Sequence, residues 1–373
     1  MTDPKRKSGV IAGFLALAIT SAAFAESNPA PDRAATAVPE QQDIPFSQAS
    51  VTRDANGRYS LHWSAERATH VNVYAMPGPD AYAERHWIGA GSRTDDMAVE
   101  LSGPDRWYFQ LVPDHGAALV VGDRRIGLEG APNFRDVGGV RTTDGRWVRM
   151  GMVYRSDALG GLTNADRDLV AALNLSAIVD LRNDAERAQS PEPEFGSASR
   201  YHFDVSADIG SDSLGWPQGA LDLIRDGNAA EVTRALNRLL VSQPSAAEGY
   251  RRMLQAIAGS DRLLFHCTGG RDRTGWAAAV VMRILGVPMK QIVADYEESN
   301  ALLPPDLLRD YWPASIPPTD AEIDALVNLR GEYLQAGFAE ADLLYGSFDN
   351  YRRRALHISD TEAESLKHRL LVQ

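Results

Sequence analysis

Apolar and polar residues alternate through the first part of the chain, from Ile44 onward. Every second residue is apolar in three segments, at Tyr59, Leu61 and Trp63, at Val71, Val73 and Ala75, and at Trp107, Phe109 and Leu111. A period of two residues is typical of strands that bury one face. Turn-forming residues lie between these segments, at Asn56-Gly57, Pro77-Gly78-Pro79 and Gly103-Pro104-Asp105. The pattern predicts a small β-sandwich over residues 44–122.

Further along the chain, short apolar runs alternate with longer segments of helical period. We predict strands near residues 148–154, 177–181, 201–203 and 263–266, with helices between and after them. This mixture is typical of an α/β domain, in which helices flank a central sheet. Residues 207–250 form a helix-rich insertion, which is either a lid over a site or a surface decoration. A capping box at Ser359–Glu362 predicts the start of the last helix.

The amino terminus has the three parts of a secretory signal peptide. Lys5-Arg6-Lys7 is basic, residues 10–24 are apolar and small, and Ala23-Phe24-Ala25 is an A-x-A cleavage site. The apolar run is shorter than the about 20 residues of a membrane span, so an uncleaved anchor is the lesser alternative. We expect a signal peptide over residues 1–25, no stable membrane insertion after its removal, and a periplasmic or secreted protein. Residues 26–43, rich in Ala and Pro, predict a flexible linker.

Composition narrows the partners and cofactors that we expect. The net charge of −12 repels nucleic acid and anionic membranes at long range, so we expect no nucleic-acid partner. Cys267 is the single cysteine, which excludes an internal disulfide. The eight histidines are scattered and form no HExxH pattern, so we expect no metal and no cofactor.

The most informative segment is Leu263–Gly275, LLFHCTGGRDRTG. A short apolar run leads into it and a longer one, Trp276–Leu285, follows, so the order is strand, tight loop and helix. Backbone amides at a helix N-terminus converge on one point and bind anions. Gly269 and Gly270 allow the dihedral angles that such a nest of amides requires. The loop therefore has the local geometry of an oxyanion site.

Two side chains of this loop add reactive chemistry. Five residues separate Cys267 from Arg273, whose planar fork can bind two phosphate oxygens at once. The positive field at the helix start favours a thiolate at the cysteine, which would face the bound phosphorus. The alternative interpretation is a buried structural cysteine in a βα turn.

This loop resembles the signature loop of cysteine-dependent protein tyrosine phosphatases. It is most similar to the HCxxGKDRTG loop of the bacterial tyrosine/serine protein phosphatase family, also called tyrosine phosphatase family 3. Four more motifs of that family occur in the same order, NFRDVGG (133–139), YRSDAL (154–159), IVDLR (178–182) and DYEESN (295–300). The resemblance covers residues 126–373 and implies the fold of a cysteine-dependent phosphatase there. Residues 44–122 separately resemble a fibronectin type III module.

The resemblance implies a two-step mechanism. Cys267 attacks phosphorus, water then hydrolyses the phosphocysteine, and Arg273 and the loop amides stabilise the transition state. The residues expected to bind phosphate are Thr268, Gly269, Gly270, Arg271 and Thr274. The family usually has lysine at the position of Arg271, which puts the substrate range in question more than the activity. We also expect the Thr274 hydroxyl to bond the thiolate.

A phosphate ester also needs a general acid for its leaving group. Asp272 is the first candidate, because family members place an aspartate beside the loop arginine. Asp204 and Asp208 are alternatives, since many tyrosine phosphatases use an aspartate on another loop. A third interpretation is that Asp272 orients Arg273 or Arg182.

The other motifs supply residues that we expect to support the loop. The resemblance places Arg135 and Asp136 in buried ion pairs below the site. Asp180 and Arg182 end a strand at the sheet edge where ligands gather, so Arg182 binds substrate or forms a buried salt bridge. His266 is expected to hold the loop through backbone contacts.

The sequence therefore predicts a protein-tyrosine phosphatase. Its substrate would be a phosphorylated protein (phosphotyrosine, phosphoserine or phosphothreonine) or a phosphoinositide. A non-catalytic phosphate-binding adaptor is the alternative. Sulfur transfer and arsenate reduction are disfavoured, because the usual loop length and partner cysteines are absent. Aromatic residues of the β-module would contact a protein partner or glycan, or else form the sandwich core or a packing surface for the catalytic domain.

Overall fold

The computed structural model describes residues 43–102, 106–194, 196–209, 220–303 and 328–372, together with Ala321 and Leu326. The chain divides into two compact units, Met1–Glu40 and Gln41–Gln373, and every described residue belongs to the second. The expected signal peptide (1–25), and the expected linker (26–43) except Asp43, lie outside the described residues. No described helix is long and apolar enough to cross a membrane.

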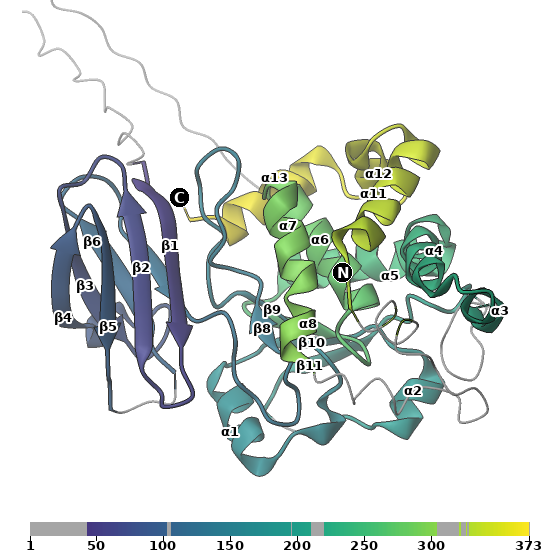
Figure 1. Ribbon diagram of the computed structural model, residues 1–373, viewed down its shortest axis with the longest axis horizontal. Helices are drawn as coiled ribbons and strands as arrows, with labels where there is room; N and C mark the ends of the chain where they lie inside the picture. Colours follow the sequence, from purple (N-terminus) through teal and green to yellow (C-terminus); the bar gives the residue numbers. More distant parts are fainter. Residues whose placement is uncertain are drawn as a thin grey trace, which may run out of the picture. The chain divides into compact units, whose positions relative to one another are not determined.

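Strands near the amino-terminal end of the described chain form two antiparallel sheets (Figure 1). The strand order in the first sheet is β1 (Phe46–Arg53), β2 (Tyr59–Ala65) and β5 (Thr94–Val99). In the second it is β4 (His86–Ser92), β3 (His70–Met76), β6 (Tyr108–Pro113) and β7 (Leu119–Gly122), with the 3-10 helix η1 (Tyr82–Glu84) before β4. Two stacked antiparallel sheets make a β-sandwich, the architecture that fibronectin type III modules share.

The inward-facing residues of the two sheets form one hydrophobic core. On β2 the predicted alternation is confirmed, because Tyr59, Leu61 and Trp63 are buried while the residues between them are more exposed. Strand β6 departs from the alternation and is buried on both faces. The reason is that Tyr108, on its other face, packs against Met150 of the following domain. Of the aromatic residues in the predicted strands, Tyr59, Trp63, Trp107 and Phe109 belong to the sandwich core, while Tyr108 packs against the following domain.

A five-stranded sheet follows, in the order β11 (Ser199–His202), β10 (Ala177–Asp180), β12 (Leu263–His266), β9 (Val153–Ser156) and β8 (Arg135–Asp136). The first four strands are parallel and β8 is antiparallel. Successive residues of β10 enter two different cores, Ile178 on one face and Val179 on the other. Both faces of the sheet are therefore covered, as expected for an α/β fold.

Helices supply the two covering layers (Figure 1). They are η2 (Leu159–Gly161), α1 (Asn164–Ala172), α2 (Asp184–Gln189), α3 (Ala220–Arg225), α4 (Ala229–Ser242), α5 (Pro244–Gly259), α6 (Asp272–Ile284), α7 (Met289–Glu297), α8 (Ser299–Leu302), α11 (Gly331–Tyr345), α12 (Phe348–Arg354) and α13 (Asp360–Leu370). The predicted capping box at Ser359 is present at the start of α13. Helices α3 to α5 occupy most of the predicted insertion, but residues 210–219 lie outside the described part, and its role as a lid stays a prediction.

The predicted strand near residues 148–154 is displaced in the structure, where β9 begins at Val153. The residues before it serve the junction with the sandwich. Trp147 belongs to the sandwich core and its Nε1 donates to the carbonyl oxygen of Phe46 at 3.2 Å. Val148 forms a bridge with Leu371. The sandwich and the α/β domain are thus parts of one compact unit with adjoining cores.

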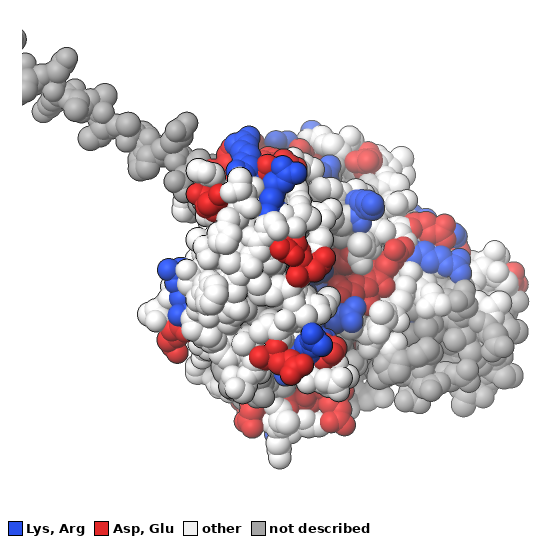
Figure 2. All heavy atoms as spheres, turned by 60° about the vertical axis from the view of Figure 1, so that its left-hand side comes forward, with Lys and Arg blue, Asp and Glu red and all other residues white. Residues whose placement is uncertain are grey.

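The net charge of the whole chain is −12. On the face drawn in Figure 2, acidic and basic side chains lie in small mixed groups. The described part of that face therefore presents no continuous basic surface of the kind that binds nucleic acid.

Candidate active site

The Cys267 loop emerges from the middle of the five-stranded sheet. Strand β12 lies between β10 and β9, and its last residue, His266, is level with Asp180 on one side and Ser156 on the other. The loop then enters α6 at Asp272, with the Cys267 side chain only 2% exposed. The loop amides, the helix start and the strand ends therefore meet at the carboxyl edge of the sheet, where ligands of α/β proteins bind.

Hydrogen-bond donors turn the carbonyl groups of the loop outward. The carbonyl oxygen of Cys267 lies 3.2 Å from Nδ1 of His266, and that of Thr268 accepts from the Ala158 amide at 2.9 Å. Asn133 Nδ2 donates to the next two carbonyl oxygens, those of Gly269 and Gly270, at 3.0 and 3.1 Å. In a nest of amides the carbonyls must point away from the anion. Their bonding to these groups fixes the peptide planes in that orientation.

Gly270 is required at its position for two reasons. Its φ is +64°, in the left-handed region that glycine tolerates. A Cβ there would lie 2.5 Å from the carbonyl oxygen of Ser156, and backbone cannot move aside cheaply. The predicted need for glycine in the loop is met at this residue by both conformation and close approach.

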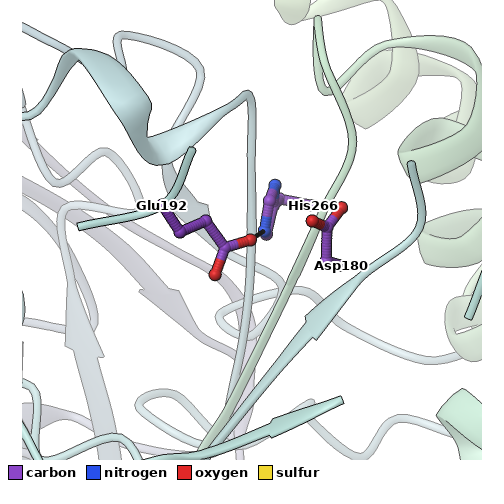
Figure 3. A group of neighbouring side chains, drawn as sticks. All are labelled: Asp180, Glu192 and His266. Atoms are coloured by element: carbon purple, nitrogen blue, oxygen red, sulfur yellow. Dashed lines mark hydrogen bonds and ion pairs between the residues drawn. The ribbon is translucent and has the colours of Figure 1, made fainter. Parts of the chain in front are cut away.

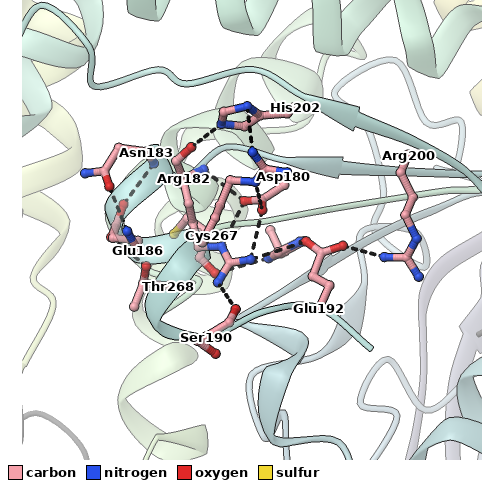
Figure 4. Close-up of polar contacts among 12 residues, drawn as sticks. Asp180, Arg182, Asn183, Glu186, Ser190, Glu192, Arg200, His202, Cys267 and Thr268 are labelled. Atoms are coloured by element: carbon pink, nitrogen blue, oxygen red, sulfur yellow. Dashed lines mark hydrogen bonds and ion pairs between the residues drawn. The ribbon is translucent and has the colours of Figure 1, made fainter. Parts of the chain in front are cut away.

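Arg273 is held by a residue that sequence reasoning did not identify. Its Nη1 and Nη2 donate to the two carboxylate oxygens of Glu186 at 2.6 and 2.5 Å, and Thr268 Oγ1 donates to the same carboxylate at 2.6 Å. Figure 4 shows Glu186 between Thr268 and its capping partner Asn183. Burial raises the pKa of Glu186, but the hydrogen bonds and charge of Arg273 outweigh it and lower the pKa to about 2. Nη2 also donates to Thr268 Oγ1 at 3.5 Å. Among the described contacts, Nε and the second N–H of Nη1 therefore stay available for a phosphate.

His266 is fixed by a second unanticipated carboxylate. Its Nε2 lies 2.6 Å from Glu192 Oε1 (Figure 3). Its Nδ1 lies 3.2 Å from the carbonyl oxygen of Cys267. Burial raises the pKa of Glu192, but its hydrogen bond and charge pairing with His266 lower it to about 2. The predicted backbone contact of His266 is present, with Glu192 as a further anchor.

Among the described residues, Asp180, Glu192 and His266 are the group whose ligand atoms approach closely enough to hold a metal ion, within 4.8 Å of one another. The site already contains a cation, because Arg182 Nε and Nη2 each donate to Asp180 at 2.9 Å. Arg182 also donates to the carbonyl oxygen of Ser190 at 2.8 Å (Figure 4). These side chains are therefore paired with one another, and we derive no metal step. Of the two interpretations of Arg182, the structure shows the buried salt bridge.

The motifs around Asn133 and Asp295 form a buried brace under the loop. Arg135 Nη1 donates to the carbonyl oxygen of Asn133 at 3.0 Å, and its Nε pairs with Asp295 at 3.5 Å. Arg155, a buried arginine of β9, connects Asp295 at 2.5 Å with the carbonyl oxygen of Gly270 at 2.7 Å. Burial raises the pKa of Asp295, but the three neighbouring arginines outweigh it and hold the pKa far below its ordinary value. The brace joins both motifs to the phosphate-binding loop.

The expectation of an ion pair at Asp136 needs correction. Its carboxylate accepts hydrogen bonds from the backbone amides of Gly138 and Gly151, at 2.8 and 2.7 Å, and makes no ion pair with a described residue. The side chain is fully buried in a turn where these amides converge. Amide donors therefore take the role that we expected of a cation.

The three candidate general acids differ in their surroundings. Asp272 is the first residue of α6, beside Arg273, and accepts a hydrogen bond from Tyr296 at 3.1 Å. Asp204 accepts from the amide and hydroxyl of Ser206, at 2.8 and 2.7 Å. Asp208 accepts from the Ser245 amide at 2.8 Å. Asp272 therefore belongs to the loop itself, and its described hydrogen bond is with Tyr296, whereas Glu186 holds Arg273.

Arg271 and Thr274, which we expected to bind phosphate, have buried side chains in the structure. Arg271 is buried, and its Nη2 donates to the carbonyl oxygen of Leu326 at 2.7 Å instead of pointing free toward a ligand. Thr274 is fully buried, and its hydroxyl has no hydrogen-bond partner among the described residues, so the expected bond to Cys267 is not formed. The surroundings of these two side chains are determined by tertiary packing, which the loop sequence does not reveal.

One family model and several known proteins are similar to this chain. A model described as the tyrosine phosphatase family matches residues 126–372. A putative tyrosine-protein phosphatase of Cupriavidus necator is 33% identical over 250 residues, which cover 65% of this chain and 88% of that protein. The triple specificity protein phosphatase PtpB of Mycobacterium tuberculosis is 27% identical over 259 residues, covering 61% of this chain and 92% of PtpB. The crystal structure of P. aeruginosa TpbA is 18% identical, with a TM-score of 0.24, and covers 52% of this chain and 90% of that chain. A family match over about two-thirds of the sequence, on the residues that build this loop, shows that the chain belongs to the tyrosine phosphatase family.

Proposed function

We propose that this phosphatase hydrolyses phosphotyrosine, and phosphoserine, phosphothreonine or phosphoinositides as well, through a phosphocysteine on Cys267. The observation that supports the proposal is a single loop that joins Cys267 to Arg273 at the start of α6, with its carbonyls held outward. The name of the relative PtpB, a triple specificity phosphatase, supports a range broader than phosphotyrosine.

The first step transfers the phosphoryl group to sulfur. The Cys267 thiolate attacks phosphorus as the bond to the leaving oxygen breaks, and Asp272 gives that oxygen a proton. Arg273 and the inward-facing amides bind the phosphoryl oxygens most strongly in the transition state, where their charge is spread in one plane. In the second step water attacks phosphorus, returns a proton to Asp272 and releases phosphate and the thiolate.

Phosphate release from phosphotyrosine, phosphoserine and phosphoinositide substrates, measured in parallel on the wild type and Cys267→Ser, tests the proposal. We expect turnover by the wild type and none by the variant, with both melting at similar temperatures. Phosphate binding without turnover in both proteins would favour the adaptor alternative. A fully active variant would show that Cys267 is not the nucleophile. The order of substrates would define the specificity.

We further propose that the protein is exported and processed after Ala25. The proposal rests on the basic, apolar and A-x-A segments of residues 1–25. Amino-terminal sequencing of the protein recovered from periplasm or medium should begin at Glu26. A chain that remains in the membrane fraction with Met1 intact would favour the uncleaved anchor.

A further inference from the structure

Arg124 lies before the matched phosphatase region, which begins at residue 126, yet its side chain reaches the brace under the active-site loop. Its Nη2 donates to Asp295, and its Nη1 lies 3.3 Å from Glu298. Its Nε donates to the carbonyl oxygens of Asp136 and Gly138, at 3.1 Å each. The Arg124 guanidinium thus forms hydrogen bonds to α7 and to the segment around β8 at the same time.

Two chains of contacts lead from Arg124 to the same loop carbonyl. In the first, Asp295 binds Arg155, whose Nη2 holds the carbonyl oxygen of Gly270 at 2.7 Å. In the second, Asp295 pairs with Arg135, which donates to Asn133, and Asn133 Nδ2 donates to the Gly270 carbonyl at 3.1 Å. Asp295 is the common element, and its side chain is only 2% exposed. One oxygen of Asp295 serves Arg124 and Arg135, and the other serves Arg155.

The sandwich fixes the segment that presents Arg124. Asp123 forms a parallel bridge with Val51 of β1, and its Oδ2 accepts from the Arg53 amide at 2.8 Å. Arg106, just before β6, donates to the carbonyl oxygens of Asp123 and, at 2.9 Å, Arg125. The backbone on both sides of Arg124 is therefore bonded to the sandwich.

We propose that Arg124 is a positioning residue for the phosphate-binding loop, and that the sandwich contributes to catalysis by holding it in place. Removing its guanidinium takes away one of the two arginines that share an oxygen of Asp295, and the carboxylate that holds Arg135 and Arg155 is then less firmly fixed. The Gly270 carbonyl then loses its fixed direction, and the neighbouring amides no longer converge on the phosphoryl oxygens. This inference rests on the proposed phosphatase function and adds to it a role for residues outside the matched region.

The test compares full-length wild type with Arg124→Ala, Arg124→Lys and the matched control Arg125→Ala. Arg125 is the adjacent arginine; its half-exposed side chain pairs with Glu298 at 3.0 Å and makes no contact with Asp295. Two quantities are measured for each protein, the kcat on an aryl phosphate and the Kd for orthovanadate by direct titration. Vanadate adopts the five-coordinate geometry of phosphoryl transfer, so its Kd reports the alignment of the loop.

We expect Arg124→Ala to lower kcat at least tenfold and to raise the vanadate Kd by a similar factor, with Arg125→Ala within twofold of the wild type. Arg124→Lys should be intermediate, because an ammonium reaches Asp295 but cannot also bond two carbonyls. A purely structural role would lower the folded fraction and kcat while leaving the Kd of the folded protein unchanged, and that result would overturn the proposal. If Arg124→Ala fails to fold, the same two measurements on Arg124→Lys decide. A rise in its vanadate Kd that accompanies the fall in kcat supports the proposal, and an unchanged Kd overturns it.

The wild-type measurements distinguish this inference from the proposed function. Wild-type turnover with an Arg124→Ala protein that matches it in kcat and Kd would refute the positioning role alone. A wild type that binds vanadate without turnover would refute the phosphatase, while a weaker Kd in Arg124→Ala would still support the positioning role. A wild type that binds no vanadate would overturn both.

Discussion

Asp157 is a buried carboxylate beside the active-site loop, and its replacement by asparagine gives a sharp test of the local electrostatics. The side chain is 5% exposed and accepts hydrogen bonds from the Asn133 amide at 3.2 Å and the Ser156 hydroxyl at 3.1 Å. Burial raises its pKa to about 7, although these hydrogen bonds and the charge of His266 oppose the rise. The folded protein therefore favours the protonated carboxyl, which asparagine resembles in shape and charge.

The sign and size of the effect follow from proton linkage. A raised pKa means that the stabilising contribution is complete below about pH 3.8 and is lost as the pH rises through about 7. The pKa of Asp157 in the folded protein is about three units above its ordinary value of 3.8. This difference corresponds to about 4 kcal/mol of stability in total, of which about 2–3 kcal/mol is lost between pH 5 and pH 8. Asparagine does not titrate. The free energy of unfolding of Asp157→Asn, relative to that of the wild type, should therefore rise by about 2–3 kcal/mol between pH 5 and pH 8.

Urea unfolding of both proteins at pH 5 and pH 8 measures this difference. Asp166→Asn is the matched control, because Asp166 is also buried but accepts three backbone amide hydrogen bonds, from Glu129, Gly130 and Thr163. Burial raises the pKa of Asp166, but these hydrogen bonds outweigh it and lower the pKa overall, so its contribution is present at high pH and lost in acid. Both pH values lie above the ordinary pKa of an aspartate, so the control should lose the same stability at pH 5 and at pH 8. A pH-independent difference for Asp157→Asn would refute the reasoning.

Three further predictions concern the loop. Glu186→Gln keeps the shape of the Arg273 partner but removes its charge, so kcat/KM should fall about 10- to 100-fold, in line with about 1.5–3 kcal/mol for a charged hydrogen bond; an increase would mean that Glu186 competes with phosphate. Gly270→Ala should destabilise the protein by about 2–5 kcal/mol in thermal or urea unfolding, from left-handed strain and overlap with backbone, whereas Gly127→Ala, with positive φ but open space, should cost about 1–2 kcal/mol. Asp272→Asn should lower kcat on alkyl phosphates at least 100-fold and much less on an aryl phosphate with a good leaving group; the same selective loss in Asp208→Asn instead would reassign the acid.

The sequence by itself determined the class of fold and the position of the chemistry. Alternating residues on β2 predicted the sandwich, because a period of two is a local property of a strand with one buried face. Strand β12 begins and ends at the predicted residues, 263 and 266. The loop from Cys267 to Arg273 could be recognised because its groups are contiguous, so that one turn of backbone already gathers them.

Partners from distant segments could not be identified in this way. Glu186 opens α2 within a capping box, N-x-x-E, that is visible in the sequence, but this motif indicates only the start of a helix. Nothing local indicates that the same carboxylate reaches Arg273, which is 87 residues away. Glu192 has no local signal at all, and it meets His266 across 74 residues.

Local sequence determines backbone conformation and burial pattern, since these depend on neighbours along the chain. Which donor satisfies each buried polar group is decided only when the sheets and helices pack, because an unsatisfied group is costly wherever it lies. Arg182 shows the difference: the sequence placed it at a strand end and left two roles open, and only the packed structure shows its salt bridge with Asp180 and its hydrogen bond to Ser190. The same requirement brought Arg124, from outside the matched region, to Asp295.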